Sequence, residues 1–525
     1  MPFQLAEESL DWALAHVMRM GDTDIFPAPF EFQAIQHSWD EVKAHLMAED
    51  LDQWLCRTQR VCLTPKGRYA YRISTQLDPL DTLVYCALTY EAGPSLEAAR
   101  IPADEEVVYS HRFDPNRDGQ LFDSAWGWRQ FVETCRERIE RPGVTHVVVA
   151  DISDFFHRLY HHRLQNALQA ATDGSDQARI ICKLIDQWAG TPSYGIPIGG
   201  SPSRLLAEVA LDDVDRYLVA EGAEFCRFSD DFRIFCGSRK EAYEKLCALA
   251  LVLFENHGLT LQPGKTRILT VQNFSDQYLS SPEGEERGNL VEKFREFLEL
   301  IDLADNWYEQ VDYEDLEPQA QQMIDELNLE DLLRAQLAAS DPDLGLVRFI
   351  LRRLAQLNDS DMAVELVDGA ERYYPVLAPI MEYITSLTDV PKVVRQRVST
   401  KIMGLVQSSA VAHLPYHRCW LLTPFASSGQ WGQAERMARI YGRATDTFTR
   451  RKTILALGWS GQDFWFRARR NSVRAMDSWE RRAFLVGASC LPTDERKHWL
   501  RSIRRWLDPL EEVIVDWVNT SPLSS

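Results

Sequence analysis

The order of hydrophobic and polar positions divides the chain into a mixed α/β part and a later helical part. Residues up to about 55 follow a helical period. The run THVVVA at 145–150 predicts a buried strand that ends at Asp151. The helix predicted after it carries apolar side chains at Phe155, Phe156, Leu159 and Leu164. A loop rich in Gly, Pro and Ser, TPSYGIPIGGSPS, then leads into an amphipathic helix from about Ser203.

A hairpin is predicted where two short apolar runs flank a pair of acids, in CRFSDDFRIF at 226–235. The flanks alternate as half-buried strands do, which places Ser229, Asp230 and Asp231 at the tip. A helix stopped at Gly258 and a turn with a strand, TLQPGKTRILTV, follow. This order predicts an α+β fold in which helices cover one face of an antiparallel sheet.

Beyond about residue 290 the strand pattern largely ends, and segments such as DPDLGLVRFILRRLAQLNDSDMAVELVDG are typical of stacked helix pairs. We find no repeated period in them, so a helical repeat and an irregular helical domain both fit. The C-terminal region is predicted to be all-α and helical-repeat-like.

The chain is globular in composition, and its charge is unevenly distributed. It has 525 residues and a net charge of −21. Residues 271–345 contain 20 acidic and 4 basic residues, whereas residues 436–505 contain 17 basic and 6 acidic ones. Because surface fields decay within a Debye length of roughly 8 Å, the local balances matter more than the total.

Two further features of the composition bear on the compartment. Ten cysteines occur without CxxC pairs or a zinc-like spacing, which favours free thiols. The N-terminus lacks a basic segment followed by an apolar one, and no apolar run of 18 residues occurs. We therefore expect a cytoplasmic protein that makes no membrane contact.

The paired acids of the hairpin raise the question of a bound cation. Adjacent carboxylates repel each other unless solvent or a cation relieves them. A solvated turn is the ordinary explanation, and it is retained for the similar pair Asp212-Asp213. Asp151, however, ends a buried strand of the same sheet, so it can converge with Asp230 and Asp231. Three converging carboxylates are typical of a pair of Mg²⁺ ions, with Mn²⁺ as an alternative, that catalyses transfer at phosphorus.

Four motifs in this part of the chain resemble those of the reverse transcriptases, over about residues 66–270. DISDFF resembles the first palm motif of that family, GIPIGGSPSRLLAEV its loop-helix motif, FSDD its catalytic hairpin and LTLQPGKTRI the motif that follows. The resemblance implies a fingers and palm fold and an RNA-directed DNA polymerase-like nucleotidyltransferase. It implies metal binding by Asp151, Asp230 and Asp231 with the backbone carbonyl of Ile152, and protonation of pyrophosphate by Lys265.

The same resemblance implies a set of residues that bind the incoming dNTP. Phe156, five residues after Asp151, stands where a bulky side chain excludes the ribose 2′-hydroxyl, and core packing is the alternative for either Phe155 or Phe156. The further nucleotide-binding candidates are Arg72, Arg112, Gly199 and Ser203. Ser203 could equally cap the helix that follows it.

Three departures from the common reverse transcriptase pattern narrow the resemblance. Ile198 replaces a glutamine that helps to align the template, Glu208 replaces an asparagine, and no RNase H domain is evident. These departures, with a long helical domain, resemble the bacterial Abi-like, defence-associated reverse transcriptases. That group implies antiphage DNA synthesis that is untemplated, homopolymeric or protein-primed. It also implies a single-stranded DNA product and a homo-oligomer. Candidate priming tyrosines are Tyr373, Tyr374, Tyr383 and Tyr416.

Two other functions remain open at this point. One is a templated reverse transcriptase that copies a dedicated non-coding RNA. The other is an inactive palm that serves as a nucleic-acid-binding or oligomerisation scaffold. The three unpaired carboxylates favour an active enzyme over the scaffold.

The basic end of the chain has two interpretations. Aromatic residues between 459 and 466 lie among the cations Arg450, Arg451, Lys452, Arg467, Arg469 and Arg470. Such a mixture favours single-stranded nucleic acid, and it could instead dock on the acidic segment 271–345. Five segments are predicted: an N-terminal helical segment (1–60), a fingers-like region (61–145), a palm (146–270), an acidic helical connector in place of a thumb (271–345) and the helical domain (346–525).

Overall fold

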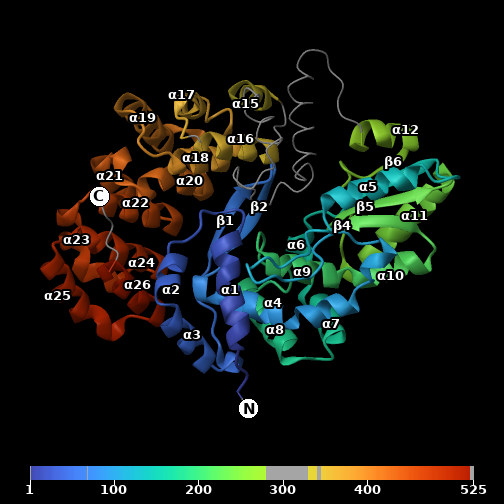
Figure 1. Cartoon of the computed structure of the whole chain (residues 1–525), viewed down its shortest axis with the longest axis horizontal. Helices are drawn as coiled ribbons and strands as arrows, with labels where there is room; N and C mark the ends of the chain where they lie inside the picture. Colours follow the sequence, from blue (N-terminus) through green and yellow to red (C-terminus); the bar gives the residue numbers. More distant parts are fainter. Residues whose placement is uncertain (1, 68, 280–328, 340–343, 357, 521–525) are drawn as a thin grey trace. The chain divides into compact units, whose positions relative to one another are not determined.

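The chain forms two compact units, and each unit is built from separate stretches of sequence. The computed structural model describes residues 2–67, 69–279, 329–339, 344–356 and 358–520 (Figure 1). The first unit comprises Met1–Asp24, His45–Arg57 and Leu80–Leu327. The second comprises Ile25–Ala44, Thr58–Pro79 and Asn328–Ser525. The predicted acidic connector, 271–345, lies largely outside the described residues.

The first unit contains a four-stranded antiparallel sheet. Its strands lie in the order β4 (Glu224–Phe228), β5 (Asp231–Cys236), β3 (His146–Asp151) and β6 (Arg267–Thr270). Each neighbouring pair is antiparallel, and in the register between β3 and β5 Asp151 lies opposite Asp231. The predicted strand that ends at Asp151, the hairpin and the strand after Lys265 are all present.

Helices cover both faces of this sheet, whereas the sequence predicted one covered face. On one face, α5 (Trp128–Ile139) packs with Val147 and Val149 of β3 in a buried apolar cluster. The alternate residues Val148 and Ile234 are also fully buried, and α11 (Arg239–Val252) packs on β3 and β5. The hairpin strands are thus buried on both faces, because β5 is an internal strand with a helix on each side.

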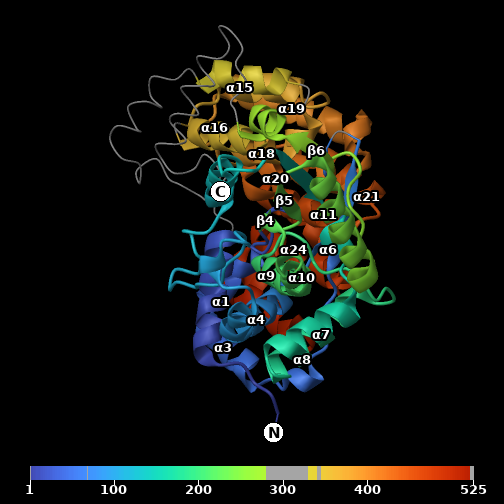
Figure 2. The same cartoon turned by 90° about the vertical axis from the view of Figure 1, so that its right-hand side faces the viewer.

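The remaining helices of the first unit differ from the prediction mainly in their ends. They are α1 (Glu7–Met20), α4 (Pro79–Ala99), α6 (Phe155–Arg158), α7 (His161–Ala171), α8 (Asp176–Ala189), α9 (Ser201–Ala210), α10 (Asp212–Ala220) and α12 (Val271–Phe274). α7 packs against α8 and α9, and α7 and α8 lie side by side in both views (Figures 1 and 2).

Two predicted helices are each divided in two. The helix after β3 stops at Arg158, because the chain turns to bond the glycine loop: the Gly195 amide donates to the Leu159 carbonyl (2.8 Å). The helix predicted from about Ser203 begins at Ser201 and breaks at Leu211 between α9 and α10. The predicted stop at Gly258 is confirmed, since this residue ends the turn after α11 with φ +64°.

The second unit is dominated by stacked helices. They are α15 (Leu329–Ala338), α16 (Leu344–Gln356), α17 (Asp361–Asp368), α18 (Leu377–Ser386), α19 (Lys392–Ser408), α20 (Pro415–Ser427), α21 (Ala434–Arg443), α22 (Thr447–Trp459), α23 (Asp463–Arg469), α24 (Ser478–Gly487), α25 (Thr493–Ile503) and α26 (Pro509–Thr520). Helices two apart pack in series, from α16 to α18, α20, α22, α24 and α26. This stacking is typical of a helical repeat, as the sequence predicted.

A period of 31 residues runs through the end of this stack, although the sequence analysis found none. Asp446, Asp477 and Asp508 each accept a hydrogen bond from the backbone amide three residues later, at the start of α22, α24 and α26. Their helices are then linked by repeated ion pairs. Arg450 contacts Glu480 (3.2 Å), and one period later Arg481 contacts Glu511.

Three N-terminal elements belong to this helical unit rather than to the sheet. They are the hairpin of β1 (Arg60–Pro65) with β2 (Tyr71–Gln76), the helix α2 (Glu31–His37) and part of α3 (Trp39–Ala48). Glu31 of α2 accepts two hydrogen bonds from Arg451 (2.8 and 2.5 Å), and Arg482 contacts Asp78 (2.9 Å). All four side chains are buried. The predicted segment boundaries remain predictions, but the compact units are interleaved in sequence.

The ten cysteines are all free thiols. Within the ranges that the structure describes, none of the helices combines the length and the apolar character needed to cross a membrane.

Candidate active site

The sheet brings the three predicted aspartates to one edge. Asp151 ends β3 directly opposite Asp231, which begins β5. The Ile152 amide donates to the Asp230 carbonyl (3.1 Å), which fixes the strand end against the hairpin tip. Asp151 is only 4% exposed, and the two hairpin acids are half-buried. Three carboxylates from two elements thus share a partly desolvated edge.

The carboxylates at this edge outnumber the positively charged side chains that contact them. Burial, with Asp231 and Asp151 nearby, raises the pKa of Asp230 to about 7. Burial also raises the pKa of Asp231, although Arg233 opposes this effect from 3.4 Å away. Each raised pKa means that ionising the carboxylate costs more free energy in the folded chain than in the unfolded chain. A cation placed here would remove that cost.

Lys265 contacts the site from the turn before β6. Backbone hydrogen bonds from Ser153 to Thr260 (2.8 Å) and from Gln262 to Asp151 (2.7 Å) hold this turn against the end of β3. The Lys265 ammonium donates to Asp151 Oδ2 at 2.7 Å. Burial alone would lower the pKa of Lys265, but the bond to Asp151 raises it. Without a bound metal ion, the contact with Asp151 therefore stabilises the protonated form of Lys265.

The donor set fits a hard divalent cation. Asp151, Asp230 and Asp231 carry three negative charges against the two positive charges of Lys265 and Arg233, so negative charge is left over. Carboxylate oxygens are the ligands that Mg²⁺ and Mn²⁺ prefer. These side chains, with the backbone of Ile152, are the residues that would hold such ions.

A second acidic group lies in the helical unit. Ligand oxygens of Glu330, Asp359 and Asp361 all lie within 4.8 Å of one another. Arg334 already contacts Glu330 at 3.0 Å. The positively charged side chain of Arg334 therefore already neutralises part of this group. The group is remote in sequence from the aspartates of the sheet.

Phe156 and Gly199 are placed consistently with the nucleotide-binding prediction. Phe155 is buried at 2% exposure, whereas Phe156 is half-buried with its ring 5.4 Å from that of Phe155. The Ile196 amide donates to the Phe156 carbonyl (3.1 Å), which ties the glycine loop to this residue. Gly199 has φ +98°, a conformation that glycine adopts without strain. Of the two phenylalanines, Phe155 is the one that packs in the core.

The geometry argues against two other nucleotide-binding candidates. Ser203 is buried inside α9, where its hydroxyl contacts the Tyr85 hydroxyl (3.1 Å), so it neither caps the helix nor faces solvent. Arg112 is buried, and its guanidinium donates to Glu97 (2.8 Å) and to two backbone carbonyls. Both side chains are held by the protein itself. Arg72 lies half-buried on β2, in the helical unit.

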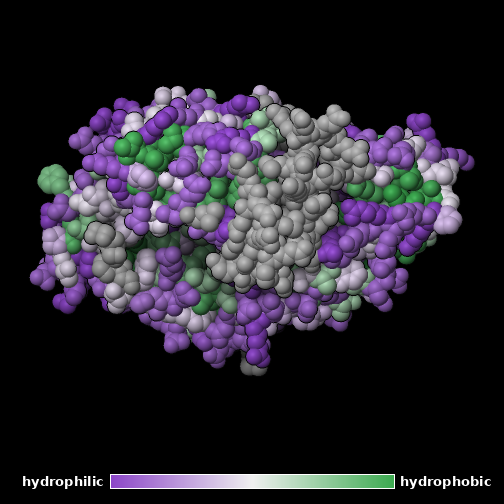
Figure 3. Space-filling view, turned by 45° about the horizontal axis from the view of Figure 1, so that its top comes forward, coloured by the Kyte–Doolittle hydropathy of each residue, from purple (hydrophilic) through white to green (hydrophobic). Residues whose placement is uncertain are grey.

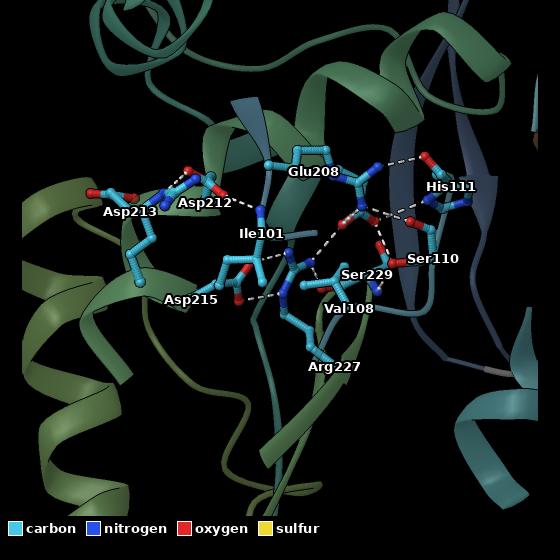
Figure 4. Close-up of polar contacts among 12 residues, drawn as sticks. Ile101, Val108, Ser110, His111, Glu208, Asp212, Asp213, Asp215, Arg227 and Ser229 are labelled. Carbon is cyan, nitrogen blue, oxygen red and sulfur yellow. Dashed lines mark hydrogen bonds and ion pairs between the residues drawn. The ribbon is translucent and has the colours of Figure 1, made fainter. Parts of the chain in front are cut away.

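Two features near the aspartates were missed by sequence reasoning. Arg233 lies on the same face of β5 as Asp231, and the period of two along the strand could have placed it there. Arg227 of the hairpin strand β4 forms a buried ion pair with Glu208 of α9 at 2.8 Å (Figure 4). The sequence analysis noted that Glu208 stands where asparagine is common. The spacing along the sequence could not reveal that Arg227 is its partner. Asp213, for which a solvated turn was expected, is exposed at the start of α10 and accepts from His257 (2.8 Å).

The basic residues of the C-terminal region are mostly paired within the unit. Arg451 pairs with Glu31, Arg450 with Glu480, and Arg467 and Arg470 both with Glu495. Arg469 instead lies 4.4 Å from the Trp465 ring centroid. These contacts weaken both predicted uses of the cations, because carboxylates of the same unit already neutralise most of them. The docking hypothesis also involves residues outside the described ranges, which Figure 3 draws in grey.

An antiparallel sheet whose hairpin and strand end gather carboxylates beside a lysine defines the palm of a nucleotidyl-transferring polymerase. Residues 110–313 match the family described as reverse transcriptase (RNA-dependent DNA polymerase). The chain thus carries a reverse transcriptase domain, and it is an RNA-directed DNA polymerase-like nucleotidyltransferase. Its fold joins that mixed α/β part to a large helical C-terminal region.

Solved telomerase structures are also similar to the chain, at low scores. The telomerase of Candida albicans in complex with a TWJ fragment of telomeric RNA has a TM-score of 0.32 at 12% identity, covering 74% of this chain and 70% of that one. The corresponding complex of Candida tropicalis has 0.33 at 12%, covering 74% and 68%. Its apo form has 0.32 at 9%, covering 74% of each chain. No curated protein matches the chain. The family match is therefore the finding that classifies the molecule.

Proposed function

We propose that the chain adds deoxynucleotides to a growing DNA strand at the edge formed by Asp151, Asp230 and Asp231, with Mg²⁺ as the divalent ion. The observation that carries this proposal is the register of the sheet, which places Asp151 opposite Asp231 and beside the hairpin tip at Asp230. An unrelieved cluster of this kind costs folding free energy, which a bound cation would return.

In the proposed reaction a hydroxyl attacks the α-phosphorus of a dNTP, and the bond to pyrophosphate breaks. Divalent ions held by the three aspartates and the Ile152 backbone would supply positive charge to the attacking and leaving oxygens. Lys265 keeps its proton when it faces these carboxylates, so it can donate that proton to the leaving pyrophosphate. Phe156 would exclude a 2′-hydroxyl by its bulk, and Gly199 would let the backbone approach the nucleotide.

We propose further that synthesis proceeds without reading a template. Ile198 supports this, since its side chain is apolar and only 9% exposed and cannot hydrogen-bond a base. The alternative is a templated enzyme that copies a non-coding RNA. Protein priming is compatible with either mode. Tyr383 and Tyr416 are buried, which removes them as primers in the described fold, whereas Tyr373 is half-buried.

One experiment separates these modes. The purified protein is treated with nuclease, then incubated with Mg²⁺ and each labelled dNTP, with and without added RNA. Product from a single dNTP without RNA supports untemplated synthesis, and label that stays on the protein after denaturation indicates protein priming. Product that needs RNA and all four dNTPs supports the templated alternative. Absence of product under every condition, together with nucleic-acid binding, supports the scaffold.

We propose a cytoplasmic role in defence against phage, in line with the resemblance to the Abi-like group. The test compares phage plating on bacteria that express the wild-type chain and on bacteria that express Asp230→Asn at the same level. Plating reduced by the wild type alone supports the proposal. Equal plating on both strains for a broad phage panel contradicts it.

We also propose that the chain forms a homo-oligomer through α11. This helix has a buried side and an exposed apolar side, where Tyr243 and Leu251 are 63% and 52% exposed, and Phe254 in the turn that follows it is 64% exposed.

The oligomer is tested by light scattering after size exclusion. Leu251→Asp should reduce the mass to that of one chain, because it places a charge in the apolar stripe. Val219→Asp is the matched control, since Val219 is an isolated valine at 48% exposure on α10. A wild-type chain that is monomeric at micromolar concentration contradicts this proposal.

A further inference from the structure

The tip of the catalytic hairpin is held in a conformation that its sequence does not favour. Ser229 has φ +52°, the left-handed region, which is strained for a residue other than glycine. This residue directly precedes Asp230. Something in the surroundings must therefore compensate for the strained conformation.

Two polar contacts hold the backbone of Ser229 on both sides. Its amide donates to the Ser110 hydroxyl at 2.7 Å. Its carbonyl accepts from Arg227 Nη1 at 2.8 Å. The Ser110 hydroxyl in turn donates to Glu208 Oε1 at 2.6 Å, and Arg227 Nη1 donates to Glu208 Oε2 at 2.8 Å. Glu208 thus closes a ring around the strained residue, as Figure 4 shows.

The ring is buried, and further charged side chains form hydrogen bonds with it. Arg227 and Glu208 are each 1% exposed. Asp215 of α10 accepts from Arg227 Nε and Nη2 at 2.8 and 2.5 Å. Arg100 donates to the Ser110 carbonyl at 2.8 Å, which fixes the segment that supplies the hydroxyl. Burial would raise the pKa of Glu208, but Arg227 and its neighbours lower it, so Glu208 stays ionised.

We propose that Ser110, Glu208 and Arg227 form a clamp that holds Ser229 in its left-handed conformation and thereby positions Asp230 for metal binding. These are positioning residues, since none of them reaches the carboxylate itself. The clamp rests on the proposed role of Asp230, and it assigns a function to the departure at Glu208. A small displacement of a reacting group costs up to about 100-fold in rate, which makes such positioning measurable.

Ser110→Ala is the variant that tests the clamp with the least disturbance. It removes one hydroxyl and leaves the buried ions paired. Ser9→Ala is the matched control, because Ser9 is a buried serine of the same unit that donates to Glu91 at 2.6 Å, far in sequence from the hairpin. Both variants lose one serine–glutamate hydrogen bond, so they should lose similar stability.

Activity is measured on the full chain with Mg²⁺ and dNTP, well below the melting temperature of every variant. Ser110→Ala should lose about 10-fold to 100-fold in kcat with KM for dNTP within twofold, and should need more Mg²⁺ for half-maximal rate. Ser9→Ala should keep kcat within twofold. If the two variants lose kcat by the same factor, or if neither loses any, the clamp is wrong.

A double-variant cycle distinguishes positioning from simple support. Ser229→Gly adopts φ +52° without strain, so the clamp has less to compensate. Adding Ser110→Ala in that background should cost kcat at least threefold less than in the wild type. Equal costs in both backgrounds would refute the clamp. Asp230→Asn is measured alongside. If this variant stays active, the assignment of the site itself is wrong. If it is inactive but Ser110→Ala costs the same in both backgrounds, only the clamp is wrong.

Discussion

Asp230 is a carboxylate that the folded chain ionises only at a cost. An unfolded aspartate has a pKa near 3.9, and folding raises that of Asp230 to about 7. Between these pH values the folded state keeps a proton that the unfolded state has released. Stability without metal should therefore fall as the pH rises from about 4 to about 7, and it stays reduced above that range.

Asp230→Asn removes this penalty and also removes the metal ligand. We expect it to abolish nucleotide addition while raising the melting temperature in EDTA, on the order of 2 °C at pH 8 and less at pH 5. Mg²⁺ at pH 8 should raise the melting temperature of the wild type more than that of Asp230→Asn. Calorimetry at both pH values checks this, and a gain that is larger at pH 5 would contradict the assigned pKa.

Phe156 is expected to set the preference for deoxynucleotides. Phe156→Ala should raise the use of rNTP relative to dNTP by tenfold or more, because the 2′-hydroxyl would no longer meet a ring. Phe155→Leu is the control, since Phe155 is a core residue and its replacement should cost stability without changing sugar choice. Competition assays with paired nucleotides measure the ratio. A ratio that shifts equally in both variants would make Phe156 a packing residue.

At this scale, the sequence located the residues whose chemistry is local to a motif. Asp151, Asp230 and Lys265 come together as predicted, because a strand end and a hairpin tip of one antiparallel sheet must share an edge. The roles of Ser203 and Arg112 as nucleotide contacts stay predictions, and motif position does not reveal that their side chains already contact Tyr85 and Glu97. Such partners lie 15 or more residues away in sequence.

Among the elements, the close approach of α22 to α24 depends on two glycines. A Cβ on Gly458 would lie 2.5 Å from Gly487 Cα, which is backbone and cannot swing aside. Gly458→Ala should therefore destabilise the helical unit by about 1–3 kcal/mol. Gly442→Ala is the control, since nothing lies within 4 Å of its Cβ, and it should be neutral or stabilising by up to about 1 kcal/mol. Thermal unfolding of both variants tests this, and equal effects would contradict it.

The type of each element was more predictable than its ends. Strand and helix periods identified β3, β5 and α11 correctly. The breaks at Leu159 and Leu211 were both missed, and the one at Leu159 depends on a partner outside the helix, the Gly195 amide. The 31-residue period was also missed, since only a capping aspartate and two adjacent arginines recur clearly while the apolar side chains vary.

On the scale of the whole molecule, Glu31 is a buried link between the N-terminal segments and the helical unit. Burial would raise its pKa, but Arg451 and Arg482 together lower it. Glu31→Gln leaves two buried guanidinium groups short of a counter-charge, so it should cost about 3–5 kcal/mol at neutral pH. Because a lowered pKa adds stability only above the unfolded value, the loss should shrink as the pH falls below about 4.

Asp176→Asn serves as the control for Glu31→Gln. Asp176 contacts Arg179 at 2.7 Å on the surface, where the pair is worth less than about 1 kcal/mol. Denaturant titration at pH 7 and pH 4 measures both variants. Equal losses in the free energy of unfolding at pH 7 would show that the buried contacts of Glu31 stabilise the fold no more than a surface ion pair does.

The helical unit cannot be isolated by cutting the chain near residue 340. Such a fragment would lack Glu31 and Asp78, the partners of Arg451 and Arg482. It should therefore be unfolded by circular dichroism, and nucleic-acid binding by the basic region has to be measured on the full chain. A soluble, fully helical fragment with a sharp melting transition would contradict the interleaved arrangement. Sequence composition could not reveal this, because it describes neighbours along the chain only.

The interleaving also sets an order of events during synthesis. Glu31 and Arg451 are 420 residues apart in sequence, and a ribosome adds about 5–20 residues per second. The N-terminal segments of the helical unit therefore wait for tens of seconds before their partners emerge. Until then, buried charges and the β1–β2 hairpin are without their final neighbours. A chain that is released before α22 and α24 are made would therefore lack the partners of Glu31 and Asp78.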